Sequence, residues 1–412
     1  MMYQAYQAHA DLMWPLRALA KTALPMLQDS SFGWSGFNSN RKLAAACETL
    51  KLGEVTHKRP PFNIASVMLK GEAIPVTEEA THVTPFATLL HFKKEFSPAV
   101  PQPKVLIVAP MSGHFATLLR DTVQTVLPDH DVYITDWHNG RDVPLSAGRF
   151  GLDEYTEHLI NFLDVIGPGS HMMAICQPCV SALSAVALMS EDKHPATPAS
   201  LTLMAGPIDC RISPTEVNKL AMTKGIDWFE KNLVSTVPWR FKGGGRKVYP
   251  GFMQLTAFMA MNKDRHVTAF KEYYANLADP DEEKLQKAEH TRKFYEEYFA
   301  VADLPAEFYL ETVSKVFQEY ALPLGELKFR GRTINPAAIR RTALLTVEGE
   351  RDDICSTGQT LAAQDLCSNL RPYMRTHYVQ AGVGHYGVFS GKRWQSQIYP
   401  LLRETIHLFE PG

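Results

Sequence analysis

The stretch His171-Met-Met-Ala-Ile-Cys-Gln-Pro-Cys-Val180 decides how this chain can fold. Its first five residues form a short apolar run that is typical of a buried strand, and a helical pattern of apolar residues follows Pro178. Cys176 therefore falls at a sharp turn from strand to helix. A thiol in this place lies at a helix N-terminus, where the partial positive charge of the helix favours the thiolate.

The residues around Cys176 fit such a turn. Ala174 adds little bulk before the cysteine, and Pro178 stands where a second small residue is usual. Proline is tolerated in the first turn of a helix, where its missing N–H would have no partner. Nucleophile turns of this kind usually read G-x-S-x-G, and here the frame is Ala174-Ile-Cys-Gln-Pro178, with cysteine at the serine position. The alternative is a buried, inert cysteine, which is the more common fate of a free thiol.

Short apolar runs alternate with amphipathic segments along much of the chain. Besides 171–175, the expected strands are residues 89–93, 104–109, 131–135, 200–204, 343–347 and 376–379. The expected helices are residues 115–127, 153–166, 178–190, 357–369 and 393–409. Strands that alternate with helices predict a mostly parallel, doubly wound sheet with helices on both faces.

Two regions depart from this alternation. Residues 1–75 are expected to form a helical N-terminal extension, and residues 210–340 show long helical patterns. We interpret the second region as a mainly helical cap or lid inserted into the core, which then consists of residues 76–209 and 341–412. The alternative is a helical layer with a packing role only.

Composition narrows the class of protein. The formal net charge of -2 gives no attraction to nucleic acid or to an anionic membrane. No apolar run is long enough for a transmembrane segment, and the N-terminus lacks the pattern of a secretory signal. We therefore expect a cytoplasmic protein. Six cysteines in 412 residues do not make a disulfide scaffold.

Two downstream loops carry the partners that a nucleophilic cysteine needs. Residues 347–354, after an expected strand, offer Asp352 or Asp353, and residues 380–388 place His385 between glycines. The chain order of nucleophile, acid and histidine is that of the α/β-hydrolase fold, which is the fold class we predict.

In this interpretation the histidine takes the thiol proton and later gives a proton to the leaving group. The aspartate holds the imidazole tautomer and stabilises its charged form. We prefer Asp352 as the acid because the acid of this fold commonly opens an Asp-x-Ile turn, and Asp353 stays as the alternative.

An oxyanion hole would need two backbone N–H groups. One is that of Gln177, directly after the cysteine, and the other is that of Met111 or Ser112 in the loop after the strand 104–109. The alternative for residues 110–114 is a turn with structural meaning only.

Cys176 and Cys179 also form a C-x-x-C pair, which allows a redox or metal interpretation. A redox domain would leave the aspartate and histidine loops unexplained. A zinc site needs about four ligands, and the sequence has no second C-x-x-C. We expect neither metal nor cofactor, and a reversible Cys176–Cys179 disulfide that silences the protein remains a hypothesis.

Five segments resemble the intracellular polyhydroxybutyrate (polyhydroxyalkanoate) depolymerases: Tyr133-Ile-Thr-Asp-Trp137, Phe150-Gly-Leu-Asp-Glu-Tyr155, Ile175-Cys-Gln-Pro178, Glu348-Gly-Glu-Arg-Asp-Asp-Ile354 and Gly384-His-Tyr-Gly387. The resemblance spans nearly the whole chain, and Cys-Gln-Pro is its most specific motif. It implies a cytoplasmic enzyme that acts on amorphous storage granules, with Cys176 as nucleophile, Asp352 as acid and His385 as base. Cys179 departs from the family, in which a serine is expected.

The related polyhydroxyalkanoate synthases resemble this chain less well. Their nucleophile motif carries glycine two residues after the cysteine, where this chain has Pro178. Their acid motif usually reads Asp-His-Ile, where this chain has Asp352-Asp353-Ile354. Both differences favour a depolymerase.

We therefore expect hydrolysis of poly(3-hydroxybutyrate) to monomers or oligomers through an acyl-enzyme. The candidate substrate-binding residues are aromatic residues of the insertion, Trp228, Trp239 and Phe241, for which a core role is the alternative. The rival functions are a synthase-like or coenzyme A-dependent acyltransferase or thioesterase, and a non-catalytic granule-binding protein. A homo-oligomer is compatible with the sequence, which does not specify an oligomeric state.

Overall fold

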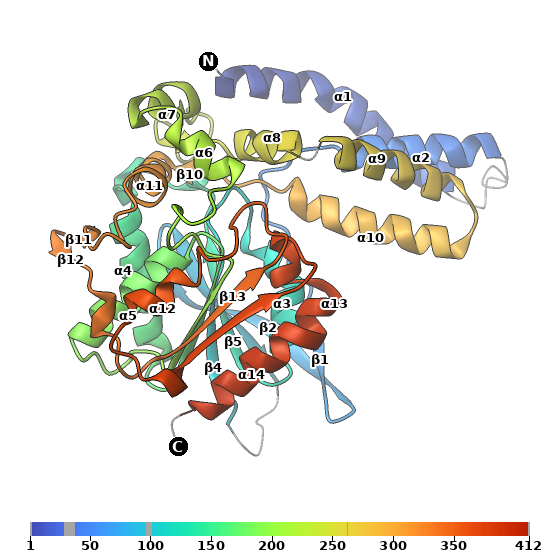
Figure 1. The fold of residues 1–412 in the computed structure, drawn as a ribbon. Coiled ribbons are helices and arrows are strands. Elements are labelled where there is room, and N and C mark those ends of the chain that lie inside the picture. Colours follow the sequence, from blue (N-terminus) through green and yellow to red (C-terminus); the bar gives the residue numbers. More distant parts are fainter. Residues whose placement is uncertain (1, 29–37, 96–100, 262, 411–412) are drawn as a thin grey trace.

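The computed structural model describes residues 2–28, 38–95, 101–261 and 263–410. Among these residues, nine strands form the central sheet in the order β1-β2-β3-β5-β4-β6-β7-β13-β14 (Figure 1). The strands are β1 (Ser66–Leu69), β2 (Glu72–Val83), β3 (Ala87–Lys94), β4 (Lys104–Val108), β5 (Asp131–Trp137), β6 (His171–Ile175), β7 (Ser200–Met204), β13 (Ala343–Gly349) and β14 (Arg375–Gln380).

The six strands from β5 to β14 in this order run parallel, whereas β1, β2 and β3 pair antiparallel at one edge. All seven predicted strands are confirmed. The predicted helical extension at residues 1–75 also contains β1 and the start of β2, so the helical part is shorter than the prediction. The sequence did not reveal β2 because nearly all of its residues are exposed or half-exposed, so that it lacks the apolar run of a buried strand.

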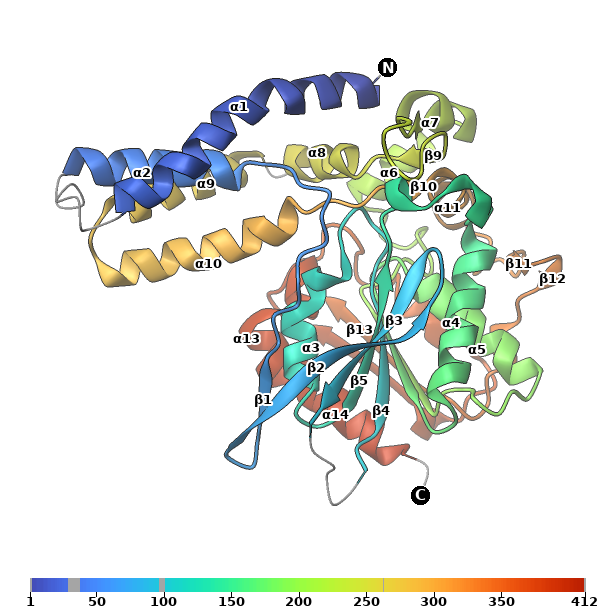
Figure 2. The ribbon, with the colours of Figure 1, turned by 180° about the vertical axis from the view of Figure 1, so that it is seen from behind.

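Helices cover both faces of the sheet. α3 (Arg120–Val126) and α14 (Tyr399–Leu408) lie on one face, and α4 (Leu152–Ile166) and α5 (Cys179–Glu191) lie on the other (Figures 1 and 2). The helix expected at residues 357–369 is shorter, because α12 spans only Ala362–Leu366. The five residues before it form turns instead, and a buried carboxylate on β13 accepts hydrogen bonds from their backbone.

The insertion between β7 and β13 is mainly helical. Its helices are α6 (Glu216–Met222), α7 (Ile226–Leu233), α8 (Gly251–Met261), α9 (Lys263–Ala278), α10 (Glu282–Tyr298) and α11 (Ala306–Glu311). Short strands between them form a small sheet of β8 (Ser235–Thr236), β9 (Lys247–Tyr249) and β10 (Leu304–Pro305), and β11 (Lys328–Phe329) pairs with β12 (Arg332–Thr333).

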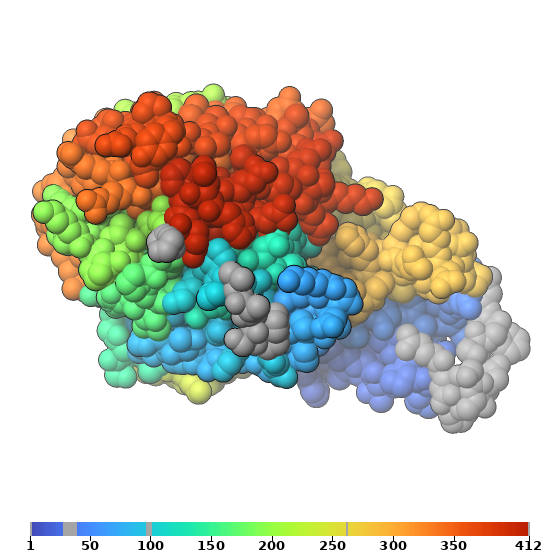
Figure 3. All heavy atoms as spheres, turned by 90° about the horizontal axis from the view of Figure 1, so that it is seen from below, coloured from blue at the N-terminus to red at the C-terminus, as the bar shows by residue number. Residues whose placement is uncertain are grey.

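Part of this insertion joins the N-terminal helices in an arm that projects beside the sheet. α1 (Met2–Gln28) packs on α2 (Asn38–Leu52), α2 packs on α9, and α9 packs on α10 (Figure 2). Seen from below, the arm extends from one side of the body (Figure 3). None of the helices that the structure describes is long and apolar enough to cross a bilayer.

The arm has its own hydrophobic core. Its buried members include Leu52 from α2, Tyr273 from α9 and Tyr295 from α10. Tyr386, which follows β14, packs against both this core and the main core around the sheet. The arm is therefore connected by one side chain to the loop that carries His385.

A buried carboxylate anchors the N-terminus of α1 to the body. The hydroxyl of Tyr3 donates to Asp303 Oδ2 at 2.6 Å, and the N–H of Gly251 donates to Oδ1 at 2.9 Å. Burial raises the pKa of Asp303 from 3.8 to about 6. The contribution of this carboxyl to stability is thus fully present below about pH 4 and is lost as the pH rises through about 6.

This pKa gives a testable pH dependence. Between pH 4 and pH 7 the wild type should lose about 2 to 3 kcal/mol of stability relative to Asp303→Asn, which cannot ionise. Urea unfolding of both proteins at the two pH values measures the difference. An equal change in the free energy of unfolding of both proteins between the two pH values would contradict the raised pKa of Asp303.

Candidate active site

Cys176 occupies a strained turn between β6 and α5. Its φ is 67°, in the left-handed region that non-glycine residues seldom adopt. The N–H of Cys176 donates to the carbonyl of Met204 at 2.8 Å, which ties the turn to the end of β7. The side chain is partly exposed, so the expected turn from strand to helix is present with the thiol at its tip.

Asp352 and His385 are in direct contact. Asp352 Oδ2 lies 2.8 Å from His385 Nδ1, and both residues are buried. The other carboxylate oxygen of Asp352 accepts the N–H groups of Ile354 and Cys355 at 2.9 and 2.8 Å. Asp353 has no hydrogen bond to the histidine within the described chain. The contact with His385 thus distinguishes Asp352 from Asp353, a choice that the sequence leaves open.

His385 also interacts with the Cys176 side chain. Burial by itself lowers the pKa of His385, but the charges of Cys176 and Asp352, together with hydrogen bonds to both, raise it well above its ordinary value. The imidazole therefore lies between a thiol and a carboxylate, where it can accept the thiol proton.

The loop 109–114 lies beside the cysteine turn. β4 and β6 are parallel neighbours, and Val108 is in register with Ala174, so both loops leave the same edge of the sheet. In the sheet, β4 lies between β5 on one side and β6 on the other, so the strand order reverses at β4. Ligands of α/β sheets bind in the crevice at such a switch point. The N–H groups of Met111, Ser112 and Gln177 have no acceptor among the described residues.

Cys179 faces the interior below the turn. It is fully buried, its Sγ lies 3.4 Å from the carbonyl oxygen of Ala174, and burial raises the pKa of its thiol. Gly206, just after β7, fits against it so closely that a Cβ there would overlap both Cβ and Sγ of Cys179. Cys179 therefore has a packing role under the Cys176 turn. No cluster of three metal-ligating side chains occurs in the described parts of the chain.

This packing predicts a large effect for a small substitution. Gly206→Ala should lower the free energy of unfolding by about 1 to 3 kcal/mol, because α5 must move to admit the methyl group. Gly53→Ala is the matched control, since a Cβ on Gly53 meets only ordinary contacts at 3.8 Å. Urea unfolding measures both, and adding Cys179→Gly to Gly206→Ala should recover part of the loss. Equal stability of the two alanine variants would contradict the prediction.

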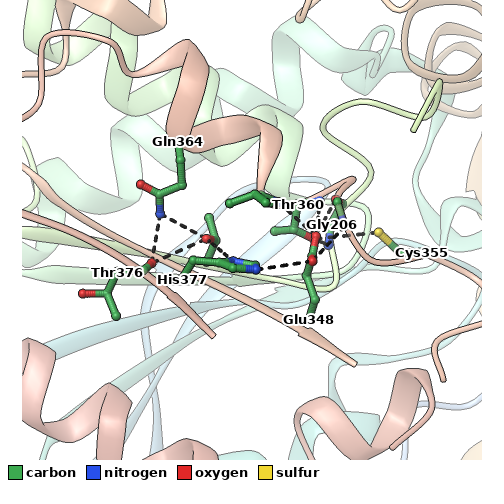
Figure 4. A network of polar contacts seen from close by, with 10 residues as sticks. Gly206, Glu348, Cys355, Thr360, Gln364, Thr376 and His377 are labelled. Atoms are coloured by element: carbon green, nitrogen blue, oxygen red, sulfur yellow. Dashed lines mark hydrogen bonds and ion pairs between the residues drawn. The ribbon is translucent and has the colours of Figure 1, made fainter. Parts of the chain in front are cut away.

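A network of polar contacts ties the loop after the aspartates to this same glycine (Figure 4). The Glu348 carboxylate on β13 is buried and accepts the N–H groups of Gly358, Thr360 and Leu361 at 2.8, 2.7 and 2.9 Å. The Thr360 hydroxyl accepts the N–H of Gly206 at 2.8 Å and donates to its carbonyl at 3.0 Å. These contacts fix the loop after Asp352 relative to the cysteine turn, a role of Glu348 that sequence reasoning missed.

A cleft of about 430 Å³ opens beside His385. One wall comes from α8, α9 and α10, and the other from the loops at residues 353–354 and 384–387. The wall on the helices is largely aromatic: Phe258, Phe294, Tyr295 and Tyr298. Sequence reasoning missed these residues, although His290, Phe294 and Tyr298 recur every four residues along one face of a helix.

The three aromatic residues expected to bind substrate do not line this cleft. Trp239 is 82% exposed, and Trp228 on α7 is also exposed. Phe241 packs against a small cluster that includes Tyr3, and the guanidinium of Arg141 lies 4.2 Å from the centre of its ring. The structure thus separates this group from Cys176, Asp352 and His385, which it brings together.

The sheet and the site define the class of this protein. A mostly parallel sheet with a turn of positive φ after β6, an aspartate after β13 and a histidine after β14 is an α/β-hydrolase fold. Residues 205–410, half of the chain, match the family model described as PHB de-polymerase C-terminus. The chain belongs to this family, and the membership supports an ester hydrolase. The matched residues include Asp352 and His385 and begin after Cys176.

Solved structures with a similar chain course are distant in sequence. A monoacylglycerol lipase from Paleococcus ferrophilus is 13% identical, with 75% of this chain and 96% of that chain covered and a TM-score of 0.41. A thermophilic esterase from Thermogutta terrifontis is 12% identical, with 82% and 99% covered and a TM-score of 0.42. A 2-hydroxy-6-oxo-6-phenylhexa-2,4-dienoate hydrolase from Rhodococcus is 15% identical, with 81% and 99% covered and a TM-score of 0.42. No curated protein sequence matches the chain.

Proposed function

We propose that this protein hydrolyses the ester bonds of poly(3-hydroxybutyrate), with Cys176 as nucleophile, His385 as base and Asp352 as acid. The observation that carries the proposal is the position of His385, which contacts Asp352 at 2.8 Å on one side and interacts with Cys176 on the other. Membership of the PHB de-polymerase family supports the polyester as substrate.

In the first half of the reaction, the Cys176 thiolate attacks an ester carbonyl and forms a C–S bond. The negative charge on the carbonyl oxygen is stabilised by backbone N–H groups, with those of Gln177 and of Met111 or Ser112 as donors. The tetrahedral intermediate collapses, the ester C–O bond breaks, and the imidazolium of His385 gives its proton to the departing alcohol end.

In the second half, His385 takes a proton from water, and the resulting hydroxide attacks the acyl-enzyme. The C–S bond breaks, the hydroxyacyl product leaves as a carboxylic acid, and the Cys176 thiolate is restored beside the imidazolium. Asp352 holds Nδ1 of the imidazole throughout, so that Nε2 faces the reacting atoms. The sequence of steps requires no cofactor.

The proposed substrate is the amorphous polymer at the surface of a storage granule, which places the protein in the cytoplasm. The aromatic wall of the cleft supports this proposal, because Phe258 and Phe294 offer apolar surface to the methyl groups of a hydroxybutyrate chain. The partly exposed thiol also supports an extended substrate, since a polymer chain needs access from outside.

The test incubates the purified protein with amorphous poly(3-hydroxybutyrate) granules and measures soluble 3-hydroxybutyrate and its oligomers. We expect product from the wild type and none from Cys176→Ala. No product from the wild type, or equal product from both proteins, overturns the proposal. A parallel incubation with 3-hydroxybutyryl-coenzyme A tests the synthase and thioesterase alternatives, and granule binding without product would indicate the non-catalytic alternative.

A further inference from the structure

The cleft beside His385 contains one cation whose role the proposed reaction does not explain. Arg265 lies in the first turn of α9 and lines the cleft wall that is otherwise largely aromatic. It is exposed, and its guanidinium has neither a hydrogen-bond acceptor nor an ion-pair partner among the described residues. Arg292 on the neighbouring helix differs, because it forms ion pairs with Glu289 and Glu296 at 2.6 Å each.

The other titratable groups in the cleft leave Arg265 without a fixed counter-charge. His266 Nδ1 lies 2.8 Å from the hydroxyl of Tyr295, and burial lowers the pKa of this histidine, which keeps it neutral. His290 lies on the same wall. Asp353 lies on the opposite wall and makes no ion pair with Arg265 in the described chain.

The size of the cleft favours a short ligand. A volume of about 430 Å³ falls in the range of sites for small molecules, and the cleft includes His385 in its lining. A hydroxybutyrate chain has repeating neutral esters with methyl groups and one charged carboxylate, at its acid end. A guanidinium binds a carboxylate through two parallel charge-assisted hydrogen bonds, and the aromatic residues accept the methyl groups.

We propose that Arg265 binds the free carboxylate of a short hydroxyacyl chain whose ester group lies at Cys176. The protein then prefers chains that present an acid end, such as the soluble oligomers released from the polymer. This assignment rests on the proposed function, because it requires the ester to react at Cys176. It makes Arg265 a specificity-determining residue for chain ends.

Binding without turnover tests the assignment. Calorimetry with Cys176→Ala compares the linear trimer of 3-hydroxybutyrate as the free acid with its methyl ester. We expect the acid to bind about tenfold more tightly than the ester, and Arg265→Gln in the same background to abolish this difference. Lys271→Gln is the matched control, since Lys271 is an exposed cation on α9 outside the cleft.

Three outcomes of this experiment overturn the assignment. They are equal binding of acid and ester, binding of neither, and an equal loss for both ligands in Arg265→Gln. The last outcome would indicate that Arg265 instead supports the cleft wall.

Hydrolysis by the wild type separates this inference from the proposed function. If acid and methyl ester trimers are both cleaved with the same KM, the carboxylate site is wrong and the hydrolase remains. If neither trimer nor polymer is cleaved while the acid still binds selectively, the carboxylate site stands and the proposed function is wrong.

Discussion

Cys176→Ala should reduce kcat/KM on a soluble hydroxybutyrate ester by about 10⁴-fold or more, because the variant lacks the thiol that interacts with His385 and that would form the acyl-enzyme. Loss of the nucleophile from a three-residue site commonly costs about as much as loss of the whole site. The residual rate comes from binding and from the oxyanion donors alone. Initial rates at several ester concentrations, measured on both proteins, give the ratio.

Cys179→Ala is the matched control for this substitution. It removes a thiol only three positions away, but one that is buried below the turn and faces Ala174. We expect kcat/KM within about threefold of the wild type and a loss of stability of about 1 kcal/mol. Mass spectrometry after brief alkylation should find the label on Cys176 first, because Cys179 is fully buried. An active Cys176→Ala would refute the assigned nucleophile.

Asp352→Asn should lower kcat by about 10³- to 10⁴-fold with little change in overall structure, as loss of the orienting carboxylate does in comparable sites. Asparagine cannot hold the imidazolium charge, and its amide can select the wrong imidazole tautomer. The neighbouring Asp353→Asn should change kcat by less than about threefold, because Asp353 has no hydrogen bond to His385 within the described residues.

The pH profile distinguishes this role from a general loss of stability. The Asp352 carboxylate is one of the groups that raise the pKa of His385, so its removal lowers that pKa. The imidazolium then deprotonates at a lower pH, and the alkaline limb of kcat/KM should move to lower pH in Asp352→Asn. An unchanged alkaline limb, or an equal loss of kcat in Asp353→Asn, would count against the assignment.

The sequence predicted the parallel part of the sheet because strands such as β4 and β6 are continuous apolar runs whose residues are nearly all buried, although β14 at the edge is only partly buried. It missed β2, which is antiparallel and mostly exposed, and it overestimated the helix at residues 357–369. Both errors have a physical cause. An exposed strand lacks the apolar run, and the chain before α12 follows hydrogen bonds to Glu348, a contact between residues ten or more positions apart.

The order of the candidate site residues along the chain was predictable from the sequence, but the contacts between them were not. Cys176 and His385 each stand alone in a distinctive loop, whereas Asp352 and Asp353 are adjacent, and only the contact with Nδ1 separates them. The cleft residues come from amphipathic helices, whose aromatic faces look the same whether they cover a core or line a cavity. Trp239 was a reasonable candidate by composition, but it lies on the outside of the insertion.

The packing of Tyr386 against two hydrophobic cores limits how far this chain can be truncated. Tyr386 follows His385 directly and packs against the core of the arm as well as the core of the body. The sheet and its covering helices carry Cys176, Asp352 and His385, whereas the arm carries none of these three residues. Removal of α1 and α2 would nevertheless expose the surface of α9 that packs on α2, and it would remove Leu52 from the core that Tyr386 contacts. We expect this change to loosen the loop that holds the imidazole of His385. We therefore expect a working shortened version of this chain to keep α2, α9 and α10, which contribute Leu52, Tyr273 and Tyr295 to the core that Tyr386 contacts.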